Sequence, residues 1–393
     1  IESSLSGVQR SFLPTEKLWY QRNFTLDDAW KGKTVILHFG AVDYECQVWV
    51  NNKLAGIHKG GNNPFSFDVT KLLRKVEVAV IDPTDTESIS RGKQQLEPKG
   101  IWYSPVSGIW QTVWLEAVNS THILQVLPTA DIHKKTVSLD ISVAKAKGGE
   151  KVKVELLDEG KVVGTTEQKL ASKIEMEVPE AVLWSPSSPK LYHLNIELLS
   201  QGQVIDQVKS YFAMREVSIR KDECGYQRIC LNGDPIFQYG TLDQGWWPDG
   251  LLTPPSEEAM LWDMVQLKNM GFNTIRKHIK VEPEQYYYYA DSLGLMMWQD
   301  MVSGFSTERK DEEHIKPNAQ TDWNAPASHT NQWQQEMFEM IDRLRFYSCI
   351  TTWVIFNEGW GQHNTVEIVE KVMEYDKSRI IDGVTGWTDR GVG

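Results

Sequence analysis

An asparagine–glutamate pair follows an unusually apolar run in the last third of the 393-residue chain. Asn357 and Glu358 come directly after residues 354–356, Val-Ile-Phe, which the pattern predicts to be a buried strand. A carboxyl group at such a position is partly desolvated, and desolvation favours its neutral form. A neutral carboxylic acid can donate a proton to a poor leaving group, which is general acid catalysis. The alternative is an exposed glutamate that only ends a strand.

Other polar or aromatic side chains stand at the ends of the neighbouring predicted strands. If these strands are parallel strands of a barrel, their carboxyl ends and the loops after them form one site. The candidates, taken in chain order, are Asp243, Arg276, His278, Asp300, Trp360 and Trp387.

Alternating apolar and polar residues fill the first part of the chain, from about residue 17 to 118. Val35, Leu37 and Phe39 alternate with polar residues, and similar runs cover 46–50 and 76–80. Asn51-Asn52-Lys53 is typical of a hairpin turn between short strands. Since no amphipathic stretch of helix length interrupts this pattern, it predicts a β-sandwich of the jelly-roll kind.

The alternation continues from about residue 121 to 220 with fewer aromatic residues. Residues 137–143, 152–156 and 192–198 alternate, with turns at Gly148-Gly149 and Gln201-Gly202. About 100 residues of short strands and regular turns predict an immunoglobulin-like sandwich. The Cys–Trp–Cys spacing of antibody domains is absent, so this assignment depends on the pattern alone.

After about residue 231 the pattern changes to strands that alternate with helices. Strands are expected at 236–240, 274–278, 295–299, 351–357 and 379–384, with four helices between them. This predicts a parallel α/β layer, either the start of a (β/α)8 barrel or an open doubly wound sheet. No glycine-rich phosphate loop follows the first strand, which favours the barrel. We therefore expect domains at 1–120, 121–220 and 221–393, the last with about five barrel strands.

Residues 302–330 form an unusually long connection without a predicted strand. It includes the acidic run Asp311-Glu312-Glu313 and Trp323. Long irregular loops inside compact domains are often functional, so we expect this one to border the site.

The composition excludes several classes of protein. The net charge of −12 argues against a nucleic-acid partner held by phosphate contacts, and no apolar run is long enough for a membrane span. All of that charge lies in residues 221–393, which also contain nine of the 16 Trp. Tryptophan offers a flat apolar face that suits the C–H face of a sugar ring. The four cysteines fit neither a disulfide framework nor a zinc site, so we expect no metal and no cofactor.

Three stretches of the sequence resemble glycoside hydrolase family 2. WVIFNEGWGQ at residues 353–362 resembles the acid/base motif of that family. WKGKTVILHFGAVDYECQVWVNNKLAGIHKGG at 30–61 and GIWYSPVSGIWQTVWL at 100–115 resemble its N-terminal sugar-binding sandwich. The resemblance runs through the three segments in the order of the family: sandwich, immunoglobulin-like domain and barrel.

This resemblance implies roles for the residues at the strand ends. Glu358 would be the general acid/base, and Asn357 would contact the 2-hydroxyl of the sugar. Arg276 would bind a hydroxyl, orient a carboxylate or form a structural ion pair. His278 comes two residues after this arginine where the family commonly has three, which leaves a core histidine as the equal alternative. Asp300 would accept sugar hydroxyls. Trp360 and Trp387 would either stack on the sugar or pack in the fold, and Asp243 would contribute to substrate binding.

The resemblance also implies a second glutamate, the nucleophile, at the end of a seventh strand. No acid of this sequence matches that position, so we expect residues 1–393 alone to be inactive. The leading hypothesis is a retaining, exo-acting β-glycosidase of the β-galactosidase kind that acts on an oligo- or polysaccharide. A β-glucuronidase of the same family and a non-catalytic carbohydrate-binding protein are the alternatives. A periplasmic or secreted location is expected from the relatives that degrade polysaccharides.

Overall fold

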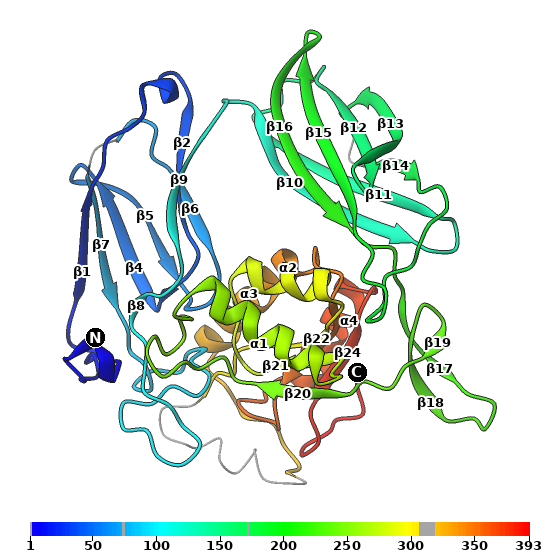
Figure 1. The fold of residues 1–393 in the computed structure, drawn as a ribbon. Coiled ribbons are helices and arrows are strands. Elements are labelled where there is room, and N and C mark those ends of the chain that lie inside the picture. Colours follow the sequence, from blue (N-terminus) through cyan, green and yellow to red (C-terminus); the bar gives the residue numbers. More distant parts are fainter. Residues whose placement is uncertain (1, 73–74, 171–172, 306–318) are drawn as a thin grey trace.

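The computed structural model describes residues 2–72, 75–170, 173–305 and 319–393. Two β-sandwiches stand against one layer of strands and helices (Figure 1). In the described part of residues 1–200, helical structure is limited to the 3-10 turns η1 (Ser4–Ser6) and η2 (Asp28–Trp30). The two segments predicted to be all-β are therefore all-β. Within the described ranges, no helix has both the length and the apolar character that crossing a membrane requires.

The first sandwich packs a four-stranded sheet against a three-stranded one. The four-stranded sheet has the order β1 (Leu18–Asn23), β7 (Lys75–Ile81), β4 (Glu45–Val50) and β5 (Lys53–Lys59). The other sheet has the order β6 (Phe65–Asp68), β2 (Thr34–Phe39) and β9 (Val113–Val118), and the short β3 (Val42–Asp43) pairs with β8 (Gly108–Ile109). Val35, Leu37 and Phe39 are buried between the sheets, as their alternation predicts. Asn51 and Asn52 form the predicted turn at φ 48° and 62°, a left-handed conformation that asparagine tolerates.

The second sandwich is entirely antiparallel. One sheet has the order β10 (His122–Asp131), β11 (Thr136–Ala144) and β14 (Ile174–Glu177). The other has the order β13 (Lys161–Lys169), β12 (Lys151–Asp158), β15 (Tyr192–Ser200) and β16 (Gln203–Phe212). Leu139, Val154 and Ile196 are fully buried between them. The immunoglobulin-like architecture expected from the pattern is present.

A small antiparallel sheet links this sandwich to the α/β layer. It contains β17 (Val217–Lys221), β18 (Gln227–Leu231) and β19 (Asp234–Pro235). The boundary predicted near residue 220 falls inside β17.

The α/β layer contains five parallel strands in chain order. They are β20 (Gly240–Asp243), β21 (Thr274–Lys277), β22 (Met296–Asp300), β23 (Ile350–Phe356) and β24 (Ile380–Val384). Four helices connect them: α1 (Glu257–Asn269), α2 (Glu284–Leu293), α3 (Ala327–Leu344) and α4 (Thr365–Tyr375). A doubly wound sheet reverses its strand order part-way, whereas a barrel adds each strand beside the last. The consecutive order confirms the barrel architecture for the described strands.

Local signals place most of these elements where the sequence predicts them. The Ser256 hydroxyl accepts a hydrogen bond from the Ala259 N–H at 3.1 Å and begins α1. Gly294 ends α2 at φ 73°, which a residue without Cβ adopts readily.

The first strand is an exception, because it begins at Gly240 rather than ending there. The Asn273 side chain bonds to the Tyr239 N–H and the Phe237 carbonyl oxygen at 2.8 and 2.9 Å. These bonds occupy backbone groups in the stretch that was predicted to be a strand. Strand pairing with β21 therefore starts only at Gly240.

Both sandwiches contact the α/β layer through specific polar groups. The Trp184 indole of the second sandwich donates to the Asp291 carbonyl oxygen at 2.8 Å, and the Tyr211 hydroxyl donates to the Asp291 carboxylate at 2.8 Å. The Tyr44 hydroxyl of the first sandwich donates to the Glu336 carboxylate of α3 at 3.0 Å. Through these hydrogen bonds, each sandwich is held against the α/β layer.

The buried Glu336 predicts a pH-dependent stability. Burial raises its pKa from an ordinary value of 4.5 to about 7, against opposing hydrogen bonds from Gln332 and Tyr44. The folded state is favoured when Glu336 is protonated. This contribution to the free energy of unfolding is fully present below pH 4.5 and is lost as the pH rises through 7. Glu336→Gln should therefore stabilise the protein by about 3 kcal/mol at pH 8 and have little effect near pH 4.5.

Urea unfolding of the chain at both pH values measures this difference. Glu374→Gln, a change of an exposed glutamate on α4, is the matched control. An effect of Glu336→Gln that is the same at both pH values would contradict the assignment.

Candidate active site

A network of charged and polar groups joins the carboxyl ends of β21, β22 and β23. The Arg276 guanidinium of β21 donates two hydrogen bonds of 2.9 Å to the Asp300 carboxylate, which ends β22. It also donates to Asn357 Oδ1 at 2.8 Å, directly after β23. His278 Nδ1 lies 3.1 Å from Asp300 Oδ2. Four of the predicted site residues therefore form one connected group.

Asp300 is the centre of this group and is fully buried. Its carboxylate is already bonded to Arg276 and His278, so neither oxygen faces solvent. This geometry makes Asp300 a positioning residue for its two neighbours, and its direct contact with sugar hydroxyls stays a prediction.

The Asn357 side chain has one satisfied and one unsatisfied end. Oδ1 accepts the bond from Arg276, which fixes the plane and direction of the amide. Nδ2 is buried and has no hydrogen-bond partner among the described residues. A buried donor without an acceptor costs free energy, so this amide is suited to an acceptor that a ligand supplies.

Glu358 follows in a left-handed backbone conformation with φ 51°. Its N–H donates to the Thr385 hydroxyl at 2.8 Å, which ties the turn after β23 to the residue after β24. Strained backbone of this kind is concentrated at functional sites. The side chain is half-buried, and no hydrogen bond or ion pair to its carboxylate is found in the described ranges. The carboxylate is thus available to a ligand beside Asn357.

Residues of the first sandwich also reach this end of the sheet. The Arg91 and Gly92 N–H groups donate to the Ser303 carbonyl oxygen, which follows β22, at 3.2 and 3.0 Å. The Trp102 ring stacks on Trp360 with centroids 5.3 Å apart. Sequence reasoning missed this contact because the partners are hundreds of residues apart. The available signal was indirect: strand alternation stops between β7 and β8.

The two candidate stacking tryptophans differ in exposure. Trp360 is 5% exposed and packs with Trp102, Phe305 and Ile279. Trp360 therefore packs in the fold, and its stacking on a sugar stays a prediction. Trp387, in the segment after β24, is 40% exposed, so its ring is accessible to a ligand.

Asp243 lies away from the other predicted residues. It shares a face of the sheet with its register partner Lys277, whose ammonium lies 2.6 Å from the Asp243 carboxylate. The Tyr286 hydroxyl of α2 donates to the same carboxylate at 2.7 Å. Burial opposes ionisation, but Lys277 and these hydrogen bonds outweigh it and hold the pKa of Asp243 well below its usual range.

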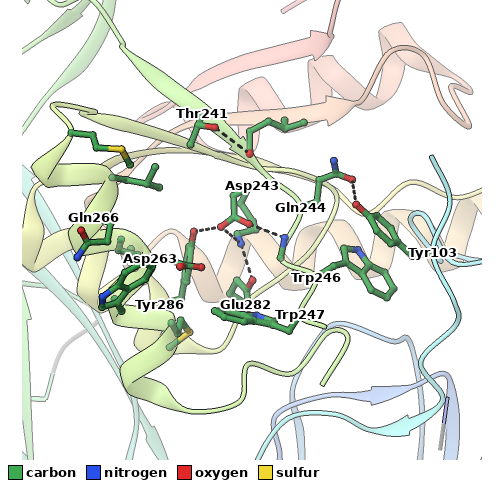
Figure 2. A pocket seen from close by; sticks show the side chains of 18 residues that line it. Tyr103, Thr241, Asp243, Gln244, Trp246, Trp247, Asp263, Gln266, Glu282 and Tyr286 are labelled. Atoms are coloured by element: carbon green, nitrogen blue, oxygen red, sulfur yellow. Dashed lines mark hydrogen bonds and ion pairs between the residues drawn. The ribbon is translucent and has the colours of Figure 1, made fainter. Parts of the chain in front are cut away.

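Asp243 lines a pocket of about 470 Å³ whose lining does not include Arg276 or Asp300. Figure 2 shows Asp243 there together with Glu282, Tyr286 and Trp246. The role of Asp243 in substrate binding stays a prediction: β-strand side chains alternate between faces, and Asp243, the register partner of Lys277, lies on the other face of the sheet from Arg276.

The long connection after β22 is described only in part. The acidic run Asp311-Glu312-Glu313 lies outside the described residues. Trp323 is buried and packs against His329 with ring centroids 4.9 Å apart. Among the described side chains, no group of three or more His, Cys, Asp or Glu residues is placed to hold a metal ion.

Comparison with known families accounts for this arrangement. The model described as "Glycosyl hydrolases family 2, sugar binding domain" matches residues 7–117, and "Glycosyl hydrolases family 2" matches 121–215. "Glycosyl hydrolases family 2, TIM barrel domain" matches 255–391. The chain belongs to glycoside hydrolase family 2.

Individual relatives of this family 2 chain carry two kinds of name. A putative β-glucuronidase of Formosa agariphila is 31% identical over 352 residues, which cover 86% of the chain and 31% of the relative. A β-galactosidase of Thermoanaerobacter pseudethanolicus is 26% identical over 93% of the chain and 48% of the relative. The crystal structure of a β-glycosidase from Bacteroides vulgatus superposes with a TM-score of 0.75 at 25% identity, over 95% of the chain and 46% of that structure. The chain thus spans about a third to a half of the length of these relatives.

Proposed function

We propose that this chain serves a retaining, exo-acting β-glycosidase of the β-galactosidase kind, with Glu358 as the general acid/base. The observation that carries the proposal is the Asn357 amide. Arg276 holds its oxygen, and its nitrogen is buried without a partner in the described ranges, next to an available carboxylate. A sugar hydroxyl is an acceptor of the right chemistry for that nitrogen.

The chemistry of glycoside cleavage explains why a carboxyl group stands beside such an amide. A glycosidic oxygen leaves poorly unless it is protonated as the bond breaks, and Glu358 would supply that proton. The same group would then remove a proton from the water that releases the sugar. The strained turn and its bond to Thr385 fix the backbone from which the carboxylate projects. Proton transfer by a positioned group contributes about 10²–10⁴-fold to the rate.

The buried network supports this function indirectly. Asp300 orients Arg276 through two parallel hydrogen bonds, and Arg276 in turn orients Asn357. A donor that is already aimed at its acceptor loses little entropy on binding. We infer that the network preorganises the sugar site, and that Trp387 adds a face for the sugar ring.

The anomeric form of the first product tests the proposal. The complete product of the gene that encodes this chain is incubated with an aryl β-galactoside and, in parallel, an aryl β-glucuronide. Proton NMR then follows the released sugar before it mutarotates. We expect the β-anomer first, with the galactoside as the better substrate. The α-anomer first, or no turnover of either substrate, would overturn the proposal.

The 393-residue chain is assayed beside the complete gene product. A retaining mechanism needs two carboxyl groups about 5–5.5 Å apart, and the family resemblance assigns only Glu358 to that pair. We therefore expect the chain alone to show no turnover. A rate within about tenfold of the complete product, a barrier difference of about 1.4 kcal/mol, would refute the expectation that its nucleophile is absent.

A further inference from the structure

A cavity of about 350 Å³ lies between the second sandwich and the α/β layer. Its walls come from β10, from the segment that follows β16, and from the connections that lead into β23 and β24. It therefore stands at the amino ends of these strands, at the opposite end of the layer from Glu358. Four of its lining side chains are cationic, and a single one is anionic. The cations are Arg215, Arg345, Lys377 and Arg379, and the anion is Asp376.

Two of these guanidinium groups converge on the same backbone oxygen. Arg215 Nη2 and Arg379 Nε both donate to the Ile350 carbonyl oxygen, at 2.8 and 3.2 Å. Arg215 also donates to the carbonyl oxygens of Ser348 and Ser378, at 2.8 and 3.1 Å. Because the two arginines share an acceptor, two positive charges are held side by side. Burial lowers the pKa of Arg215, and the nearby Arg379 guanidinium lowers it further.

The positive charge of this cavity is not balanced by the carboxylates around it. Carbonyl oxygens satisfy N–H groups of Arg215 but do not neutralise its charge, and it forms no ion pair with any residue that the structure describes. Asp376 lies 3.8 Å from Arg379. Arg345 is paired with Asp342 at 2.9 Å, yet its Nε is buried and has no hydrogen-bond partner in the described part of the chain. Four cations thus have two carboxylates to balance them, and one buried donor is left over.

We propose that this cavity binds a tetrahedral oxyanion, a phosphate or sulfate group, between the second sandwich and the α/β layer. This inference goes beyond the proposed function and does not depend on it. An anion here would relieve the repulsion between Arg215 and Arg379, and it would accept the Nε hydrogen of Arg345. In a partly buried site such opposite charges attract each other more strongly than they do in water.

The placement of the three arginines favours a tetrahedral group over a planar carboxylate. Arg215 follows β16, Arg345 precedes β23 and Arg379 precedes β24, so their donors come from three separate segments. A tetrahedral group offers oxygens in three or four directions, whereas a carboxylate offers two oxygens in one plane. Paired N–H donors of arginine also match the oxygens of phosphate. Phe212 and Phe346 give the cavity an apolar wall, which an organic part of a phosphate ester would contact.

Calorimetric titration of the 393-residue chain with inorganic phosphate, at constant ionic strength, tests this inference. Sulfate, phenyl phosphate and acetate are titrated in parallel. We expect phosphate or sulfate to bind at least about tenfold more tightly than acetate, a difference of about 1.4 kcal/mol. Tighter binding of phenyl phosphate than of free phosphate supports an organic ester as the natural ligand, and the reverse order supports the free ion.

Arg345→Met is the decisive variant. Arg215→Met is less suitable, because Arg215 binds three carbonyl oxygens that join the two domains. The Arg345 side chain binds no carbonyl oxygen within the described ranges, so its variant should unfold in urea much as the wild type does. Its phosphate affinity should fall about tenfold, because hydrogen bonds to charged groups contribute about 1.5–3 kcal/mol. Arg345→Lys should lose less, and Lys161→Met, a change of an exposed lysine outside the cavity, should lose nothing.

Three results would overturn the inference. The first is no phosphate or sulfate binding, or binding no tighter than that of acetate. The second is phosphate binding that is unchanged in Arg345→Met. The third concerns the complete gene product, which is titrated in the same way: if it binds neither anion while the 393-residue chain does, an acidic side chain of the remaining polypeptide already balances the cavity.

Discussion

Glu358→Gln in the complete gene product is expected to slow hydrolysis of β-glycosides with alkyl or sugar leaving groups by about 10²–10⁴-fold. These leaving groups need a proton as the bond breaks, and a glutamine amide cannot supply it. Nitrophenolate leaves without protonation, so formation of the glycosyl-enzyme from nitrophenyl glycosides should be slowed far less. Added azide should restore turnover of these activated substrates, because it attacks without the base that Glu358 normally provides.

Initial rates on the two substrate classes, with and without azide, measure this effect. Glu367→Gln is the matched control, since that glutamate is exposed on the nearby helix α4. The same loss on both substrate classes, with no recovery in azide, would remove Glu358 from its assigned role.

Asp300→Ala should have the second largest effect, on stability and on sugar binding together. The change leaves the Arg276 guanidinium without its buried carboxylate, and removal of one partner of a buried pair costs about 3–5 kcal/mol. Arg276 and His278 also lose the group that orients them. The Asn357 amide then loses its fixed direction, so galactose affinity should fall with stability.

Urea unfolding measures the stability of the 393-residue chain. A titration with galactose, followed by ligand-observed NMR, measures its sugar affinity. Asp28→Ala is the control, because it removes an exposed ion pair with Lys31, which is worth about 0–1 kcal/mol. Asp300→Asn keeps the volume of the side chain but removes its negative charge. We expect it to weaken sugar binding as well. A loss of stability below about 1 kcal/mol for Asp300→Ala would show that the network is not coupled as described.

The sequence predicts elements well where local signals agree with each other. Ser256 with two following glutamates marks the start of α1, and Pro283 and Gly294 bracket α2. The sandwich strands follow from alternation, because one face of each strand is buried. The first barrel strand is misplaced because Asn273, more than 30 residues away, binds the backbone of the preceding segment.

The candidate site is predicted less completely, for two physical reasons. Alternation shows that Asp243 and Arg276 lie at strand ends, but only pairing with Lys277 and the helix layer shows which face each side chain takes. The contact of Trp102 with Trp360 depends on how one domain docks on another. No local pattern records such a contact.

The segment that connects β7 to β8 has a consequence for the construction of chimaeras. It begins and ends in the first sandwich, yet Arg91, Lys93 and Trp102 contact residues after β22 and β23. If the barrel were fused to the sandwich of another protein, it would keep Glu358, but Trp360 would lose its contact with Trp102. To preserve the interface, residues 83–107 of the first sandwich would have to be transplanted together with the barrel. In homologous sequences, substitutions at positions 102 and 360 are accordingly expected to change together.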